Sequence, residues 1–349
     1  MTVPTAVPAT VHASGAAPLL DIRGLTVEFA TRHGAVHAVN SVSFTMDRGE
    51  TLALVGESGS GKSVTSLAVN GLLPKGTKVG GEARFSGQDV LAATERDRER
   101  LRGRHIAMIF QDPQSSLNPV LRIDEQIGET IRAHETVTAD EVRKRTLALL
   151  AQVGIPRPAE VMRAFPHQLS GGMRQRVMIA IAMALEPELL IADEPTTALD
   201  ATIQAQILEL LLAMTADRGT AMLLITHDMG VVARSSGRVA VMYAGHIVET
   251  ATTRDLFAHP RHPYTDGLLR STPRIDRPIE QLRPIQGSPP DPSKLAAGCP
   301  FAPRCPRRLP VCDSVMPPLE PVAAAAATGP SSAPEHLVAC HNPIPVPAA

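Results

Sequence analysis

Alternating apolar and polar positions predict short strands near the beginning of the chain. Three such stretches lie between residues 20 and 55, and turn signals at 32–34 and 47–49 separate them. From about residue 123 to 184 the apolar residues recur at helical spacing instead. Beyond residue 189 strands and helices alternate again. This order predicts an α/β fold in which a helical insertion interrupts a parallel sheet.

The two ends of the chain differ in composition from its middle. Residues 1–19 are rich in proline, alanine and threonine and contain no lysine or arginine. They lack the basic start of a secretory signal, so we expect a disordered tail. Beyond about residue 260 proline becomes dense and the periodicity fades. We therefore expect a main domain over 20–260, with a helical subdomain at about 112–184, and a loop-rich extension over 261–349.

Charge and hydropathy exclude several kinds of partner. The 349 residues carry a formal net charge of -1 and the sequence pI is about 6.9, so nothing indicates nucleic acid as a partner. No apolar run approaches the roughly 20 residues needed to cross a bilayer. All four cysteines lie beyond residue 298, which leaves the main domain without thiols. These features predict a cytosolic protein.

A glycine-rich loop follows the predicted buried strand 51–55. Gly56, four further residues, Gly61, Lys62 and Ser63 have the spacing of a loop that wraps phosphates, and a helix begins directly after them. Backbone amides and the helix dipole then face an anion, Lys62 reaches the outer phosphates and Ser63 ligates Mg²⁺. The alternative is a strand-to-helix turn without a ligand. The residues expected to bind the nucleotide here are Gly56, Glu57, Ser58, Gly59, Ser60, Gly61, Lys62, Ser63 and Val64.

A second predicted strand ends in two neighbouring carboxylates. Four apolar residues, 189–192, precede Asp193 and Glu194. Asp193 is suited to hold Mg²⁺ and Glu194 to polarise the attacking water, because one carboxylate has to stay with the metal while the other acts as a base. Acidic residues at strand ends are common, so this pair needs support from other motifs.

That support comes from residues 169–177, which read LSGGMRQRV before a predicted helix. This motif resembles the signature of the ATP-binding cassette (ABC) family. The resemblance implies an ABC-type ATPase core of parallel sheet and antiparallel β-subdomain. In that family the motif closes over the ATP held by a partner subunit, and its glycines lie at a helix N-terminus, where backbone amides face an anion. The signature residues expected to face the partner's ATP are Ser170, Gly171, Gly172 and Gln175.

Further positions match the family's motifs one by one. Gln111 resembles the glutamine that contacts Mg²⁺ and links the sheet to the helical insertion. Residues 198–200 resemble the D-loop, with Asp200 between paired subunits. His227 resembles the histidine that contacts the γ-phosphate and steadies Glu194. Phe29 is the candidate for stacking on adenine, although it also fits a core position. The expected Mg²⁺ ligands are Ser63, Gln111 and Asp193.

Two segments after the main domain resemble one branch of the family. Residues 259–274 and 284–306 are similar to the corresponding parts of dipeptide and oligopeptide importer subunits. The resemblance implies an ATPase subunit at the cytoplasmic face of the membrane. It would pair with a second ATPase subunit, either a different one, which is favoured, or a copy of itself. Two membrane permeases and a solute-binding protein would complete the transporter, and no nucleic acid is expected. The alternatives are a nickel-importing ABC ATPase and a soluble ABC ATPase that acts on nucleic acid or ribosomes.

Four cysteines mark the extension. Cys299, Cys305, Cys312 and Cys340 are separated by 5, 6 and 27 residues, and four thiolates fit either zinc or an iron–sulfur cluster. Structural zinc usually has tighter first pairs. Together with the family resemblance, this favours a 4Fe–4S cluster. Zinc is the main alternative, and a disulfide pair or free thiols are less favoured.

Overall fold

The computed structural model describes residues 17–32, 34–197, 199–272, 284–322 and 336–345. The chain forms two compact units. Unit 1 comprises Met1–Asp47, Thr51–Ala92 and Thr226–Ala349, and unit 2 comprises Arg48–Glu50 and Ala93–Ile225. The tail predicted over 1–19 lies, up to residue 16, outside the described residues. Within the described ranges, no helix combines the length and the apolar character that a membrane crossing requires.

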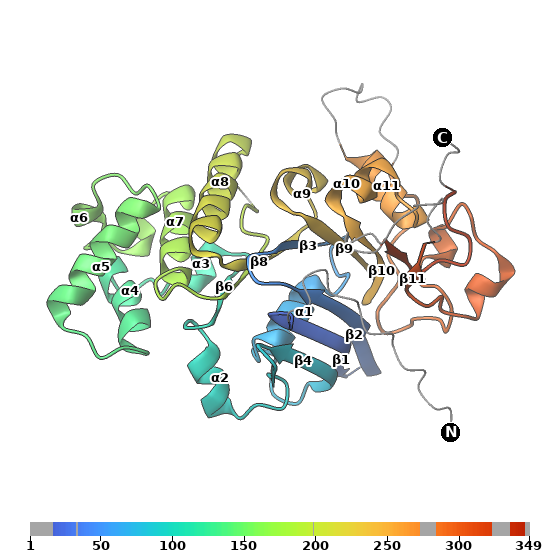
Figure 1. The fold of residues 1–349 in the computed structure, drawn as a ribbon, viewed down its shortest axis with the longest axis horizontal. Coiled ribbons are helices and arrows are strands. Elements are labelled where there is room, and N and C mark those ends of the chain that lie inside the picture. The colour runs from blue at the N-terminus through green and yellow to red at the C-terminus, as the bar shows by residue number, and fades with distance from the viewer. Residues whose placement is uncertain (1–16, 33, 198, 273–283, 323–335, 346–349) are drawn as a thin grey trace. The chain divides into compact units, whose positions relative to one another are not determined.

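Unit 1 begins with an antiparallel sheet in the order β2-β1-β4-β5 (Figure 1). Its strands are β1 (Leu20–Thr31), β2 (Gly34–Met46), β4 (Lys78–Phe85) and β5 (Gln88–Asp89). Alternating side chains of β1, among them Leu20, Ile22, Leu25 and Val27, are almost completely buried. One face of the strand therefore packs into the core, as its sequence pattern predicts.

A second group of unit 1 strands leads to the phosphate loop. β3 (Thr51–Val55) pairs in parallel with β9 (Arg238–Tyr243), and β10 (His246–Thr252) returns antiparallel to β9. Two short strands of the extension, β12 (Leu337–Val338) and β11 (Glu320–Pro321), continue the pairing from β10. The helices of this unit are α1 (Lys62–Val69), α9 (Met229–Ser235), α10 (Thr253–Ala258) and α11 (Pro263–Ser271), with 3₁₀ turns at Ala302–Arg304 and Pro310–Asp313.

The extension shares a hydrophobic core with these strands. Val55 of β3 and Val241 of β9 lie in one buried cluster with Tyr264 and Phe301 from beyond the main domain. The rings of Tyr264 and Phe301 lie 5.4 Å apart, and both contact Tyr243. The C-terminal part therefore packs directly against the strands that carry the phosphate loop.

Unit 2 contains parallel strands and the helical insertion (Figure 1). β7 (Leu189–Asp193) lies between β6 (Ile106–Ile109) and β8 (Ala221–Thr226), whose last residue falls in unit 1. All five residues of β7 are buried. The helices are α2 (Glu95–Leu101), α3 (Pro113–Ser116), α4 (Ile123–Arg132), α5 (Ala139–Gln152), α6 (Pro158–Val161), α7 (Gly171–Ala182) and α8 (Ala201–Arg218), with a 3₁₀ turn at Pro166–Gln168.

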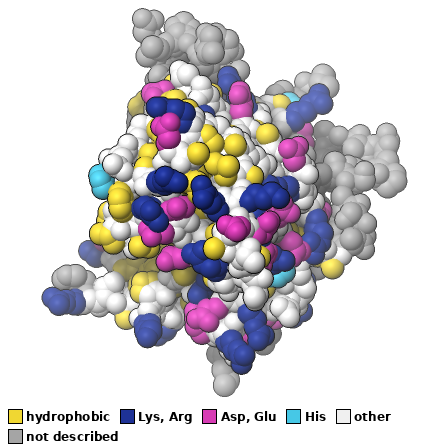
Figure 2. Space-filling view, turned by 90° about the vertical axis from the view of Figure 1, so that its left-hand side faces the viewer, with side chains coloured by type: hydrophobic (Ala, Val, Ile, Leu, Met, Phe, Trp, Pro, Cys, Tyr) yellow, Lys and Arg dark blue, Asp and Glu magenta, His cyan; other side chains and the backbone are white. Residues whose placement is uncertain are grey.

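Local sequence explains where the insertion helices begin and which side they bury. Ile123, Ile127 and Ile131 of α4 recur every four residues and are fully buried. Thr138 begins α5 because its hydroxyl accepts a hydrogen bond from the Glu141 amide at 3.3 Å. On the surface shown in Figure 2, basic and acidic side chains are interspersed with apolar ones.

Within unit 1 a buried carboxylate of β10 anchors the C-terminal segment. Glu249 of β10 is 0% exposed and accepts hydrogen bonds from the amides of Arg261 and His262, at 2.6 and 2.9 Å. Its Oε1 also lies 2.7 Å from Nε2 of His336. Because a buried charge without partners is costly, these three contacts make Glu249 a fixed point for two segments of the extension.

We expect Glu249→Gln to loosen residues 336–345, because an amide offers one acceptor oxygen where three donors converge. The free energy of local unfolding of this segment should fall by about 1–3 kcal/mol. Hydrogen exchange at the Ala339 amide, which donates to Val248 O at 2.8 Å, should accelerate accordingly. Glu320→Gln, at an exposed position of β11, is the control, and an equal acceleration in both variants would contradict the anchoring role.

Candidate functional site

Two glycines let the phosphate loop pack closely against its neighbours. A Cβ atom at Gly56 would lie 2.1 Å from the carbonyl oxygen of Met242. At Gly61 it would lie 2.4 Å from the carbonyl oxygen of Ala38, and the backbone there has φ +103°. Neither position accepts a side chain without moving backbone, so the glycines of the motif are required by packing as well as by an approaching anion.

Lys62 is held inside the loop it follows. Lys62 is the first residue of α1 and is 5% exposed. Its ammonium group donates to the carbonyl oxygens of Gly56 and Glu57, at 2.9 and 3.0 Å, and lies 3.4 Å from Ser60 Oγ. A buried cation beside the N-terminus of a helix makes this loop suited to bind an anion such as a nucleotide phosphate.

Residues of the extension hold the first turn of the loop. The amide of Glu57 donates to the Tyr264 hydroxyl at 2.8 Å. The carboxylate of Glu57 forms an ion pair with Arg304 at 2.7 Å. Sequence reasoning did not identify Tyr264 or Arg304 as functional, because the contacts join positions 207 and 247 residues apart and leave no local signal.

In unit 2 Glu194, the predicted catalytic base, contacts Gln111, the glutamine predicted to bind Mg²⁺. Asp193 ends β7 and is 5% exposed, and Glu194 follows with φ +45°, a conformation that is uncommon outside glycine. Gln111 Nε2 donates to Glu194 Oε2 at 3.0 Å, and Thr197 Oγ1 donates to the same oxygen at 2.8 Å. Two donors thus fix the carboxylate in a half-buried position next to the end of the strand.

The signature and D-loop residues each begin a helix of unit 2. Ser170 caps α7, accepting a hydrogen bond from the Met173 amide at 3.4 Å. Asp200 caps α8, accepting from the amides of Thr202 and Ile203 at 3.1 and 3.0 Å. Gln175, which we expected to face a partner's ATP, is 2% exposed within α7. The neighbouring Ala198 lies outside the described residues.

The remaining predicted site residues belong to unit 1. His227 is exposed and follows β8, directly before Asp228, which caps α9 through the Gly230 amide at 2.7 Å. Phe29 is half-buried in β1 and pairs with Val36 of β2. Their roles toward the γ-phosphate and adenine stay predictions.

The four cysteines line one small cavity in the extension. The thiols are those of Cys299, Cys305, Cys312 and Cys340, and none forms a disulfide. Burial raises the pKa of Cys299 and Cys305, and it raises the pKa of Cys340 to about 11. Thiols with raised pKa stay protonated near neutral pH unless a cation stabilises the thiolate.

The donor set is suited to a thiophilic metal, but the arrangement is not that of a metal site. Amides of Arg307, Leu309 and Asn342 each donate to a cysteine sulfur at 3.4 Å, as they would to a ligating thiolate. Across the described part of the chain, however, no group of three or more His, Cys, Asp and Glu side chains is placed to hold a metal ion. Among the described residues the structure therefore shows no formed site for the predicted 4Fe–4S cluster or for zinc.

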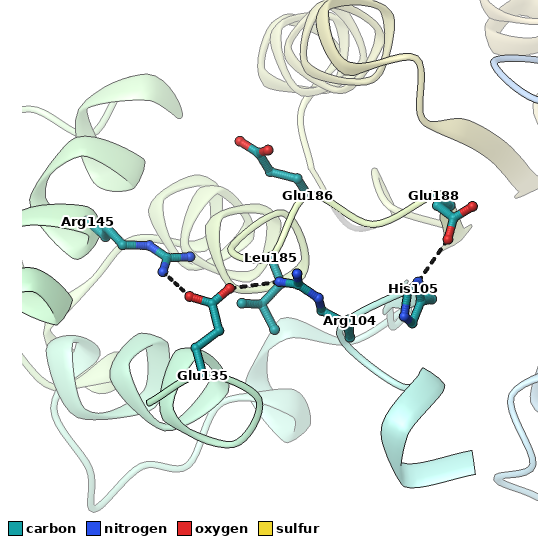
Figure 3. A pocket seen from close by; sticks show the side chains of 7 residues that line it. All are labelled: Arg104, His105, Glu135, Arg145, Leu185, Glu186 and Glu188. Atoms are coloured by element: carbon teal, nitrogen blue, oxygen red, sulfur yellow. Dashed lines mark hydrogen bonds and ion pairs between the residues drawn. The ribbon is translucent and has the colours of Figure 1, made fainter. Parts of the chain in front are cut away.

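A charged pocket of about 400 Å³ lies elsewhere in unit 2 (Figure 3). Glu135 lies between Arg104 and Arg145 and forms ion pairs with both, at 2.7 Å to Arg104. His105 and Glu188 form another pair at 2.8 Å. Glu135 thus ties the loop before β6 to helix α5 of the insertion.

The motifs, taken in this order and on this fold, define an ATPase of the ATP-binding cassette class. The family described as "ABC transporter" matches residues 39–197, and the one described as "Oligopeptide/dipeptide transporter, C-terminal region" matches residues 248–312. The dimeric structure of MJ0796, a bacterial ABC transporter cassette, is similar with a TM-score of 0.61 at 27% identity. That similarity covers 67% of this chain and 99% of the other, and it confirms the predicted ABC-type α/β fold.

Similar proteins with known transport roles identify the branch of the ABC class to which this chain belongs. The dipeptide transport ATP-binding protein DppD of Bacillus subtilis (strain 168) is 50% identical over 301 residues, which is 86% of this chain and 90% of that protein. The oligopeptide transport ATP-binding protein OppD of Salmonella typhimurium is 46% identical over 326 residues, covering 93% of this chain and 94% of that protein. The chain therefore belongs to the ABC transporter family, among its dipeptide and oligopeptide transport ATP-binding proteins.

Glu135→Gln tests the ion pairs of the charged pocket. The hydrogen bond from Arg145 holds the pKa of Glu135 below its ordinary value, so the stabilisation is complete above that value and is lost as the pH falls through the folded-state pKa. Near pH 7 the variant should be less stable by about 1 kcal/mol. The thermal unfolding temperatures of the two proteins should converge as the pH falls below the folded-state pKa of Glu135.

Glu160→Gln is the matched control, because the pair of Glu160 with Arg157 is 68% and 78% exposed at its two ends. A stability difference between wild type and Glu135→Gln that stays constant down to the acid end would contradict the assigned ion pairs.

Proposed function

We propose that this chain is the ATPase subunit of an ABC transporter that imports dipeptides or oligopeptides. The observation that carries the proposal is the agreement over 86% of the chain with a dipeptide transport ATP-binding protein, extension included. The match of the extension to the oligopeptide/dipeptide transporter C-terminal region favours peptides over nickel as the transported substrate. It also supports a transport role over one on nucleic acid or ribosomes.

Nucleotide binding starts at the phosphate loop. The loop amides and the helix α1 N-terminus bind the phosphates, and Lys62 exchanges its carbonyl partners for the outer phosphates. Ser63, Gln111 and Asp193 would hold Mg²⁺, which neutralises phosphate charge when bound. Asp193 suits that role because its carboxylate ends the buried strand β7.

Hydrolysis depends on the orientation of one carboxylate. Glu194 accepts the proton of the attacking water, and Gln111 and Thr197 hold its side chain while it does so. His227 supports the γ-phosphate. Because Gln111 stands between β6 and the helical insertion, its contact with Glu194 connects hydrolysis to the part of the chain that faces the permeases.

The transporter needs further subunits. A second ATPase subunit, either a different one or a copy of this chain, supplies the opposing signature, and Ser170 of this chain closes over that partner's ATP. Two permeases carry the translocation path, and a solute-binding protein delivers the peptide. The chain is then peripheral, at the cytoplasmic face of the membrane.

Glu194→Gln should leave ATP affinity near wild type and reduce turnover of the assembled transporter by about 10²–10⁴-fold, because the base is lost while the phosphate contacts remain. Lys62→Ala should instead weaken ATP binding. The measurements are equilibrium binding of ATP, steady-state hydrolysis and uptake of a labelled dipeptide by proteoliposomes that contain the permeases.

Glu209→Gln, at an exposed position of α8, is the control for Glu194→Gln and should behave as wild type. Turnover above one tenth of the wild-type rate in Glu194→Gln would show that the base lies elsewhere. Uptake of Ni²⁺ with no uptake of peptide would overturn the assigned cargo.

We also propose that the four cysteines hold a 4Fe–4S cluster, with zinc as the alternative. Four soft sulfur donors around one cavity, with amides directed at three of them, support a thiophilic metal. Bound there, the cluster would stabilise a segment that has little hydrophobic core of its own.

Protein purified without oxygen should then contain about four iron and four sulfide per chain and absorb visible light. Replacing Cys312 by Ser should abolish the absorbance while the unit 2 core stays folded, since unit 2 contains no cysteine. Stoichiometric zinc without iron would overturn the cluster, and a metal-free protein under the same conditions would overturn both assignments.

A further inference from the structure

Arg304 extends from the cysteine-bearing segment to the phosphate loop. It ends the 3₁₀ turn Ala302–Arg304, directly before Cys305, and its side chain is 5% exposed. Nη1 donates to Glu57 Oε2 at 2.7 Å and Nη2 donates to Glu57 Oε1 at 3.1 Å. This two-point pairing of guanidinium and carboxylate fixes both groups in one plane, and it is among the strongest polar contacts a protein forms.

The guanidinium is itself held rigidly. Its Nε donates to the carbonyl oxygen of Gln286 at 3.0 Å, and Nη1 also donates to the Tyr243 hydroxyl at 3.2 Å. The charged group lies 5.8 Å from the ring centre of Tyr243 and 6.0 Å from that of Phe301. Nη2 also donates to the carbonyl oxygen of Ile285 at 3.4 Å, so the two N–H groups that pair with Glu57 point in a preset direction.

Glu57 connects the fixed Arg304 side chain to Lys62, the residue predicted to bind the outer phosphates. Its amide is occupied by the Tyr264 hydroxyl at 2.8 Å, and its carbonyl oxygen accepts from Lys62 Nζ at 3.0 Å. The carboxylate, the amide and the carbonyl of a single loop residue are thus all engaged. Pro289 and Pro290 of the extension line a small pocket together with Glu57 and the loop residues that follow it.

We propose that Arg304 is a positioning residue for ATP binding, so that the extension sets the affinity of the phosphate loop. Arg304 fixes the Glu57 side chain, which fixes the first turn of the loop and the carbonyl that Lys62 leaves when phosphate arrives. The inference rests on the proposed ATPase function and adds to it a named route from the extension to the nucleotide. Because the guanidinium is engaged by Glu57, Tyr243 and backbone carbonyls, Arg304 acts on binding through the loop and not on the chemical step.

Arg304→Met in the full chain tests this route. Equilibrium binding of ATP with Mg²⁺ should weaken about tenfold, and KM for ATP in the assembled transporter should rise by a similar factor while kcat stays within about twofold. Glu57→Gln should have the same effect. The double variant should be no weaker than either single variant, because both remove one interaction.

Arg308→Met is the matched control. Arg308 lies four positions further along the same segment and pairs with Asp313 at a surface where the two side chains are 51% and 47% exposed. It should bind ATP like wild type. Should Arg304→Met fold poorly, Arg304→Lys keeps the charge without the two-point geometry and should give a smaller rise in KM with the same kcat.

Wild-type affinity in Arg304→Met, or effects of Arg304→Met and Glu57→Gln that simply add, would overturn the inference. An equal loss in Arg308→Met would also overturn it, because the extension would then act only as a general structural support. A wild-type chain that does not bind ATP would overturn the proposed function instead, and that result is separate from any difference between variants.

Discussion

The phosphate loop has to keep backbone amides and a buried ammonium group directed toward an anion that is bound only part of the time. This constraint accounts for much of unit 1. Gly56 and Gly61 lie so close to neighbouring carbonyl oxygens that side chains are excluded, and Lys62 is held by the loop's own carbonyls. β3 and β9 supply the fixed end from which the loop starts. The loop is therefore preset for an anion before one arrives, which reduces the cost of binding.

The backbone and side chain of Glu194 in unit 2 are also held in one fixed conformation. A non-glycine residue with positive φ costs roughly 1–3 kcal/mol and persists only where its surroundings hold it. Gln111 and Thr197 hold the side chain, and the amide of Glu194 donates to Ile225 O at 2.9 Å. The glutamine that restrains the Glu194 side chain leads into the helical insertion.

Local chemistry made a large part of this structure predictable. The strand before the phosphate loop, its two glycines, the buried strand that ends at Asp193 and the caps at Ser170 and Asp200 each depend on a few neighbouring residues. The contacts of Glu57 with Tyr264 and Arg304 were not predictable, because they join residues 207 and 247 positions apart. The spacing of the four cysteines indicated a shared site, and the thiols do line one cavity. Spacing alone cannot fix the distances that a metal requires, and the structure does not show them.

The pairing of β12 with β10 has a consequence for how the protein is made. Glu249 and His336 are separated by 87 positions, and unit 1 begins at the N-terminus, gives way to unit 2 and resumes at Thr226. On the ribosome the residues of unit 2 emerge as one nearly continuous stretch, whereas unit 1 waits for the last segment of the chain. The nucleotide-binding half of the protein therefore completes its folding last, because the core around β3 and β9 includes Phe301, which is synthesised only after both strands.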